Sequence, residues 1–196
     1  MKDYRTEISK YIMTEMSILG TLDVNALNAV LNLLEETLES EKMIYIMGNG
    51  GSAATASHFQ NDFNKGISEY TEKKFRFLCL NDNVPTIMAI ANDIGYDEIF
   101  RFQLLGKLRP GDVVIGISGS GNSKNIINAV EYAKECGNVV VGITGFGGGK
   151  LRAMADYSLH VPVNSMQITE DIHMVFDHLM MSIFYRELCG IEHLKG

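Results

Sequence analysis

Residues 42–62 read K-M-I-Y-I-M-G-N-G-G-S-A-A-T-A-S-H-F-Q-N-D, and this stretch decides the fold. The apolar run at residues 43–47 predicts a β-strand, and the turn at residues 48–51 is rich in glycine, which permits positive φ angles. Ser52 is a good N-cap residue, so a helix is expected over residues 53–63. Such a strand–turn–helix unit directs several backbone N–H groups and a helix N-terminus at one point, which suits a phosphate or sugar hydroxyls.

Two side chains on this expected helix carry chemistry. His58 and Asp62 are four residues apart, so they share one helix face. One interpretation is an ordinary ion pair on the helix surface. The other, which we favour, is that the helix forms one wall of a sugar-phosphate site.

Strands and helices alternate along the rest of the chain. Two amphipathic helices are expected before the first strand, over residues 3–19 and after Asp23, and a long helix over residues 167–190. Because the central strands are apolar on both faces, the pattern indicates a parallel sheet covered on both sides. The sequence therefore predicts an α/β fold: a five-stranded, doubly wound, flavodoxin-like parallel sheet flanked by helices. One domain is expected over residues 1–196, with a helical pair at 1–41 and an α/β core at 42–196. The expected strands lie at residues 43–47, 75–80, 113–117, 139–144 and 158–161. Residues 64–74 are expected to form a surface connection.

Composition narrows the class of protein. The 196 residues carry a net charge of −7 and no cluster of lysine or arginine beyond a pair, so no nucleic acid partner is expected. The three cysteines are odd in number and far apart, which fits a reducing cytosol better than a disulfide framework. No apolar run approaches the ~18 residues of a membrane span. A cytoplasmic protein with no membrane partner is therefore expected.

A second polar turn follows another apolar strand and reads Ser118-Gly119-Ser120-Gly121-Asn122-Ser123. A cap and a turn need only one serine, and three hydroxyls at a helix start suit a phosphate dianion. Since open parallel sheets bind ligands at the carboxyl ends of their strands, the two turns are expected to lie together and form one site.

The first turn also matches the loose dinucleotide pattern G-x-G-x-x-A over residues 48–53. That pattern needs an acidic residue about 20 positions later at a strand end. None stands there, so no nucleotide cofactor is expected.

Four segments resemble the sugar isomerase (SIS) domain family and, within it, the phosphoheptose isomerases. They are G-N-G-G-S-A-A-T-A-S-H-F, A-N-D-I-G-Y-D-E-I-F, G-D-V-V-I-G-I-S-G-S-G-N-S and the late Q-x-x-E-D-I-H-M-V-F-D-H. The resemblance covers nearly the whole chain. It implies an aldose–ketose isomerase that interconverts sedoheptulose 7-phosphate and a D-glycero-D-manno-heptose 7-phosphate, commonly as a homotetramer with sites at subunit interfaces.

The resemblance also assigns substrate-binding residues. The implied sugar contacts are Asn49, Gly50, Gly51, Asn92 and Asp93, and the implied phosphate contacts are Ser118, Ser120 and Ser123. We assign Ser52, Gly119 and Glu170 to the same substrate site.

The chain departs from the family pattern at three positions. Asp62 stands where the family has its catalytic glutamate, Glu170 where it has glutamine, and Gln167 where it has aspartate. The aspartate carboxylate is one C–C bond shorter, ~1.5 Å, and a ~1 Å misplacement can cost ~100-fold in rate. Either the pocket has moved inward, the substrate differs, or this activity is lost.

The candidate metal ligands are His58, Asp62, Glu170 and His178. The family implies His58 and His178, and the two carboxylates complete a donor set that suits Zn²⁺, one ion per subunit. The sequence leaves a metal-assisted and a metal-free reaction open. In either, Glu170 or Asp62 would be the base and His178 the partner acid.

Two further alternatives remain at this stage. His178 could instead pair with Asp171, or His173 with Asp177, as structural contacts. The whole protein could also be a non-catalytic SIS protein that binds a sugar phosphate or a protein partner, as the DnaA initiator-associating protein resembles this family without its catalytic glutamate. Asp62, Glu170 and His178 together favour chemistry.

Overall fold

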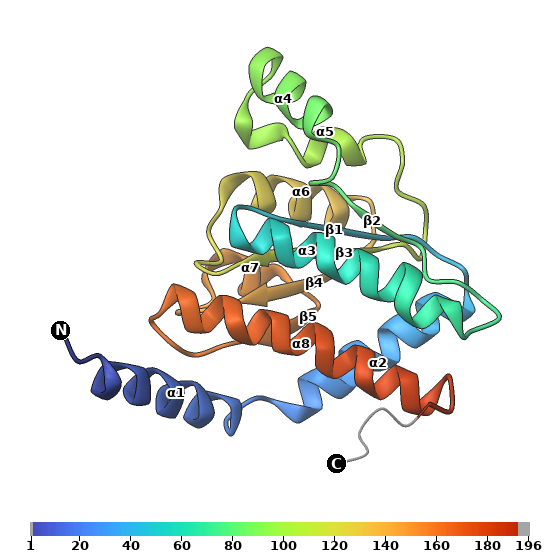
Figure 1. Cartoon of the computed structure of the whole chain (residues 1–196). Helices are drawn as coiled ribbons and strands as arrows, with labels where there is room; N and C mark the ends of the chain where they lie inside the picture. The colour runs from blue at the N-terminus through green and yellow to red at the C-terminus, as the bar shows by residue number, and fades with distance from the viewer. Residues whose placement is uncertain (1, 192–196) are drawn as a thin grey trace.

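The protein, represented by a computed structural model that describes residues 2–191, is built on one five-stranded sheet (Figure 1). Met1 and residues 192–196, the ends of the expected domain, lie outside the described residues. The strand order is β2-β1-β3-β4-β5, and every neighbouring pair is parallel, which confirms the predicted α/β architecture. The strands are β1 (Ile44–Gly48), β2 (Phe77–Cys79), β3 (Val113–Ser118), β4 (Val139–Thr144) and β5 (Tyr157–His160).

Helices cover both faces of the sheet, because alternate side chains of its buried strands point into two separate cores. Ile46 and Ile115 point into one core, which α2, α3 and α8 complete. Tyr45 and Val114 point into the other, which α4, α5, α6 and α7 complete. The helices are α1 (Arg5–Leu19), α2 (Val24–Glu39), α3 (Gly51–Asn61), α4 (Val84–Asp93), α5 (Arg101–Leu104), α6 (Lys124–Glu135), α7 (Gly149–Met154) and α8 (Met166–Glu187), with a 3₁₀ turn at Tyr96–Glu98.

The two leading helices differ in how they pack. Asp23 caps α2 by accepting hydrogen bonds from the backbone N–H groups of Asn25 and Ala26, and α2 buries five leucine or valine side chains in the core. Helix α1 buries none and projects along the edge of the molecule (Figure 1). The Tyr11 hydroxyl on α1 donates a hydrogen bond to the Asp171 carboxylate on α8.

Helix α3 differs from its prediction at both ends. It begins at Gly51, because Gly50 adopts a φ of 56° and reverses the chain before Ser52, so the prediction that Ser52 is the N-cap was wrong. Beyond Asn61 the chain continues through a π-helical turn (Asp62–Gly66) and a 3₁₀ turn (Ile67–Glu69), whereas helix was expected to residue 63 and a surface connection over residues 64–74. The fully buried side chains of Phe63 and Ile67 extend the apolar stripe of α3 and hold these turns in the core.

No single helix within residues 2–191 has the length and apolar composition of a membrane span. Helices α1 and α2 pass that test only as a pair, across a bend of 69°.

The packing of α2 predicts that Leu34→Ala lowers the free energy of unfolding by about 2–5 kcal/mol, because Leu34 is fully buried and the change leaves a cavity. Val24→Ala is the matched control on the same helix, since Val24 is 73% exposed, and it should change stability by less than about 0.5 kcal/mol. Urea titration of both variants measures the difference. Equal effects would show that α2 is not part of the core.

Candidate active site

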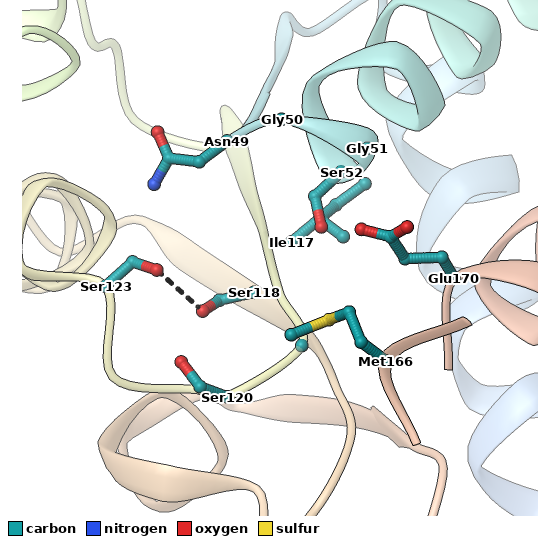
Figure 2. Close-up of a pocket in the computed structure, with 11 residues that line it drawn as sticks. Asn49, Gly50, Gly51, Ser52, Ile117, Ser118, Ser120, Ser123, Met166 and Glu170 are labelled. Atoms are coloured by element: carbon teal, nitrogen blue, oxygen red, sulfur yellow. Dashed lines mark hydrogen bonds between the residues drawn. The ribbon is translucent and has the colours of Figure 1, made fainter. Parts of the chain in front are cut away.

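A pocket of about 280 Å³ opens where β1 and β3 end side by side. In this strand order the chain leaves β1 and β3 toward opposite faces of the sheet, which is where open parallel sheets leave a crevice. The turn after β1 supplies one wall, the turn after β3 a second, and the start of α8 a third (Figure 2). The lining residues are Asn49, Gly50, Gly51, Ser52, Ile117, Ser118, Gly119, Ser120, Ser123, Met166 and Glu170.

Three serine hydroxyls gather on one side of the pocket, opposite Glu170 (Figure 2). The hydroxyl oxygens of Ser118 and Ser123 are 3.1 Å apart and form a hydrogen bond, which leaves one of their two hydrogens free. The Ser120 hydroxyl accepts a hydrogen bond from the Asn122 N–H at 3.2 Å, so its own hydrogen is free to donate elsewhere. Ser123 also precedes α6, whose N-terminus carries positive dipole charge.

Glycine packing fixes this serine turn. Gly121 has a φ of +66°, and a Cβ added there would lie 1.9 Å from the Gly148 carbonyl oxygen. The Leu151 N–H donates to the Gly121 carbonyl at 2.9 Å, and the Lys150 N–H donates to the Asn122 side chain at 3.1 Å. The loop that begins α7 therefore supports the serine turn directly.

A small amide network orients Asn49 at the mouth of the pocket. Its side-chain oxygen accepts hydrogen bonds from Asn125 Nδ2 at 2.9 Å and from the Tyr96 hydroxyl at 3.0 Å. Its Nδ2 donates in return to Asn125 Oδ1 at 2.9 Å. Asn125 and Tyr96 were not predicted from the sequence; an asparagine in the first turn of α6 was the available signal for Asn125.

The Glu170 carboxylate lies against the first residue of α3. A Cβ added to Gly51 would stand 2.3 Å from Glu170 Oε1, so in this structure the carboxylate occupies the space that a side chain at position 51 would fill. The N-terminus of α3 favours negative charge at this position. Within residues 2–191 no lysine, arginine or histidine forms an ion pair with Glu170, and none lines the pocket. Glu170 is thus a carboxylate that faces the cavity.

A second group of side chains gathers further along α3 and α8. His58, Asp62, Asp177 and His178 each offer one donor atom, and these atoms all lie within 4.8 Å of one another. The Nε2 atoms of His58 and His178 are 3.1 Å apart, and His58 Nε2 lies 3.3 Å from Asp62 Oδ2 and 3.8 Å from Asp177 Oδ2. We call these four residues the His–Asp cluster.

Asp177 is the unusual member of the His–Asp cluster. Its side chain is fully buried, and neither carboxylate oxygen has a hydrogen-bond partner among the described residues. Burial raises the pKa of Asp177 to about 8, and the nearby Asp62 carboxylate adds to the rise. Such a carboxyl needs either a proton or a cation.

The structure brings most of the predicted substrate residues together and leaves two apart. Nine line the pocket: Asn49, Gly50, Gly51, Ser52, Ser118, Gly119, Ser120, Ser123 and Glu170. Asn92 and Asp93 do not line it; they are exposed at the end of α4, where the Asn92 amide donates to the Asp93 carboxylate at 2.7 Å.

The predicted metal set also differs from the group that the structure assembles, because Asp177 stands in the His–Asp cluster and Glu170 does not. The two alternative histidine pairs do not form either. Asp171 accepts its hydrogen bond from Tyr11, and both ring nitrogens of His173 lack a hydrogen-bond partner among the described residues.

The pocket and the His–Asp cluster lie one after the other along the two packed helices α3 and α8. Helices α3 and α8 are side by side (Figure 1), Glu170 meets Gly51, and His178 meets His58. From Gly51 to His58 a helix rises ~10 Å. Glu170 and the His–Asp cluster therefore occupy successive positions along α3 and α8, and none of the four cluster residues lines the pocket.

This fold and site define a class of protein, and comparison with known proteins agrees. The SIS domain family matches residues 10–145. A phosphoheptose isomerase of Helicobacter pylori is 37% identical over 161 residues, 82% of this chain and 83% of its own, and a probable phosphoheptose isomerase of Thermoplasma acidophilum is 33% identical over 90% and 97%.

Solved structures extend this similarity to three dimensions. Phosphoheptose isomerase from Neisseria gonorrhoeae superposes with a TM-score of 0.85 at 30% identity, covering 93% of this chain and 98% of that one. A phosphoheptose isomerase from Francisella tularensis gives 0.87 at 25% identity, covering 95% and 100%. The chain therefore belongs to the SIS domain family and, within it, to the phosphoheptose isomerases.

The buried His173 makes the stability of the fold depend on pH. Burial lowers the pKa of His173 to about 4 from an ordinary 6.5, so the folded state resists protonation that the unfolded chain accepts. Its contribution to stability is fully present above about pH 6.5 and is lost as the pH falls toward 4, in total on the order of 3 kcal/mol. Urea unfolding between pH 4 and 7 should show this loss in the wild type and a smaller one in His173→Leu. The same pH slope in both proteins would contradict this assignment.

Proposed function

We propose that this protein is a phosphosugar aldose–ketose isomerase that interconverts sedoheptulose 7-phosphate and D-glycero-D-manno-heptose 7-phosphate. The observation that carries the proposal is the pocket itself, which sets three serine hydroxyls opposite the Glu170 carboxylate at the β1/β3 crevice. The names of its relatives support the same substrate.

The serine turn is proposed to hold the phosphate. The free hydroxyl hydrogens of this turn and the N-terminus of α6 offer hydrogen bonds and positive dipole charge to a dianion. Because neither lysine nor arginine lines the pocket, the phosphate would be bound by neutral groups. Binding of the phosphate by neutral groups suits a sugar phosphate that must be released after each turnover.

Glu170 is proposed to move the proton between the reacting carbons. Its carboxylate takes a proton from C1 of the ketose while the C2 carbonyl oxygen gains one, which gives an enediol. The same carboxyl then returns its proton to C2 as the C1 hydroxyl loses one and becomes the aldehyde. No atoms or electrons are gained or lost. Of the two candidate bases, Glu170 lines the pocket and Asp62 does not, which supports Glu170.

Substrate length supports a long sugar. With the phosphate on C7, an extended carbon chain places C1 and C2 roughly 8 Å away, given C–C bonds of ~1.5 Å. From the serine turn, such a chain is proposed to bring C1 and C2 to the Glu170 carboxylate on the opposite side of the pocket. In the metal-free enzyme, the protons on the two sugar oxygens are proposed to reach His178 through water, because a helix rises ~12 Å from Glu170 to His178 and the His178 side chain is 58% exposed. Asp62 is proposed to hold His58 in place at 3.3 Å.

The same cluster is proposed to bind Zn²⁺, with His58, Asp62 and His178 as ligands. Two imidazoles and a carboxylate suit this ion, and tetrahedral ligands ~2.1 Å from zinc stand ~3.4 Å from one another. The observed separations of 3.1, 3.3 and 4.0 Å lie close to that value. When bound, the ion would hold α3 and α8 together beside the pocket and place positive charge near the reacting end of the sugar.

We further propose a cytoplasmic homotetramer with sites at subunit interfaces. All three cysteines are free, which fits a reducing compartment. Helix α1 leaves Ile8, Ile12 and Met16 at least half exposed, an apolar face of the kind that subunit contacts cover.

Turnover of purified protein tests the function directly. Incubation with sedoheptulose 7-phosphate, with and without Zn²⁺, should give the aldoheptose phosphate signals in ¹³C NMR, and shorter ketose phosphates should react more slowly because C1 falls short of Glu170. Folded protein that turns over none of these sugars yet binds one would support the rival function, a non-catalytic SIS protein that binds a sugar phosphate. Folded protein that neither converts nor binds any of them would contradict both functions.

Two substitutions should separate the roles within the pocket. Glu170→Gln should lower kcat about 100-fold or more with little change in KM, because the amide cannot carry the proton. Ser120→Ala should raise KM about tenfold with kcat nearly unchanged, because it removes one hydrogen bond to the phosphate.

The matched controls are Glu187→Gln, near the far end of α8, and Ser40→Ala, at the end of α2; both should behave as the wild type. Full activity of Glu170→Gln would contradict its assignment as the base and would indicate that Asp62 has this role. A lowered kcat with unchanged KM in Ser120→Ala would contradict the proposal that the serine turn binds the phosphate.

A further inference from the structure

Asp177 plays no part in the mechanism proposed above, although it is the most deeply buried acid of the site. It directly precedes His178 on α8, and its Oδ2 lies 3.8 Å from His58 Nε2 on α3. Its carboxylate is 0% exposed and has no hydrogen-bond partner among residues 2–191, so among these residues only the contact with His58 offsets its burial.

The orientation of this carboxylate is specific. One of its oxygens lies within 4.8 Å of the donor atoms of His58, Asp62 and His178 alike. The four atoms come from α3, from the π-helical turn that follows it and from α8. A buried acid that served only to fill space would have no reason to point its unpaired oxygens at two imidazoles and another carboxylate.

We propose that Asp177 is the fourth protein ligand of the metal site, in the place where the sequence suggested Glu170. The inference deepens the proposed zinc site and rests on it. Glu170 and His178 are eight residues apart on α8, a rise of ~12 Å, whereas Asp177 is adjacent to His178. The Glu170 carboxylate instead packs against Gly51 in the sugar pocket.

A fourth protein ligand would separate the role of the zinc ion from that of Glu170. Four protein ligands close the coordination shell of Zn²⁺, as in structural sites. The ion would then cross-link α3 to α8 and fix the side wall of the pocket, and Glu170 would remain free to exchange protons with the sugar.

The test measures zinc affinity and needs no turnover. Chelator competition on the full chain should give a dissociation constant that rises about 100-fold or more in Asp177→Asn and changes less than threefold in Glu170→Gln. Asparagine has the shape of aspartate but no charge, so the fold should survive; circular dichroism of the metal-free variant checks this. The opposite order of effects, or equal effects in the two variants, would overturn the proposal.

Zinc X-ray absorption of the loaded wild-type protein gives an independent check if Asp177→Asn fails to fold. Two imidazole nitrogens and two carboxylate oxygens are expected around the ion, with the same spectrum in Glu170→Gln. A spectrum that changes in Glu170→Gln, a shell with one carboxylate and one or more waters, or no zinc binding at micromolar concentration would contradict the closed four-ligand site.

Discussion

The parallel pairing of β1 with β3 is the constraint on which the site depends. The pairing runs to the last residue of β1, where Gly48 stands opposite Ile117, so the two strands end together. From there one connection turns toward α3 on one face of the sheet and the other toward α6 on the opposite face. The crevice between them receives two helix N-termini, those of α3 and α6.

Close backbone approaches turn that crevice into a defined pocket. Gly51 lets the Glu170 carboxylate lie against the start of α3, and Gly121 lets the α7 loop support the serine turn. A Cβ at position 51 would stand 2.3 Å from the flexible end of Glu170, whereas one at position 121 would stand 1.9 Å from the Gly148 backbone, so the serine turn is the more firmly fixed of the two walls. The hydrogen bonds of Asn49 with Asn125 and Tyr96 then set the mouth.

The strands, the two polar turns and most of the pocket could be predicted from the sequence because each depends on local chemistry. Apolar runs identify strands, and serines or glycines after them identify turns that face a ligand. Asp177 could not be assigned in this way. Its role depends on how α3 and α8 are rotated against each other, which places it beside His58 rather than beside His173. Asn92 and Asp93 were expected in the pocket from the family resemblance, and within one chain they stay on the surface of α4.

The changes from the family pattern at Asp62 and Glu170 can be explained together. Asp62 is shorter than the family's glutamate, and Asp177 supplies a second carboxylate to the same cluster, while Glu170 stands free in the pocket. The central claim is that proton transfer has moved to Glu170. A crystal structure with sedoheptulose 7-phosphate bound tests it most directly. The account predicts the phosphate among the three serine hydroxyls and the reacting carbons within ~3 Å of the Glu170 carboxylate. Reacting carbons placed against Asp62, with Glu170 turned away, would contradict it.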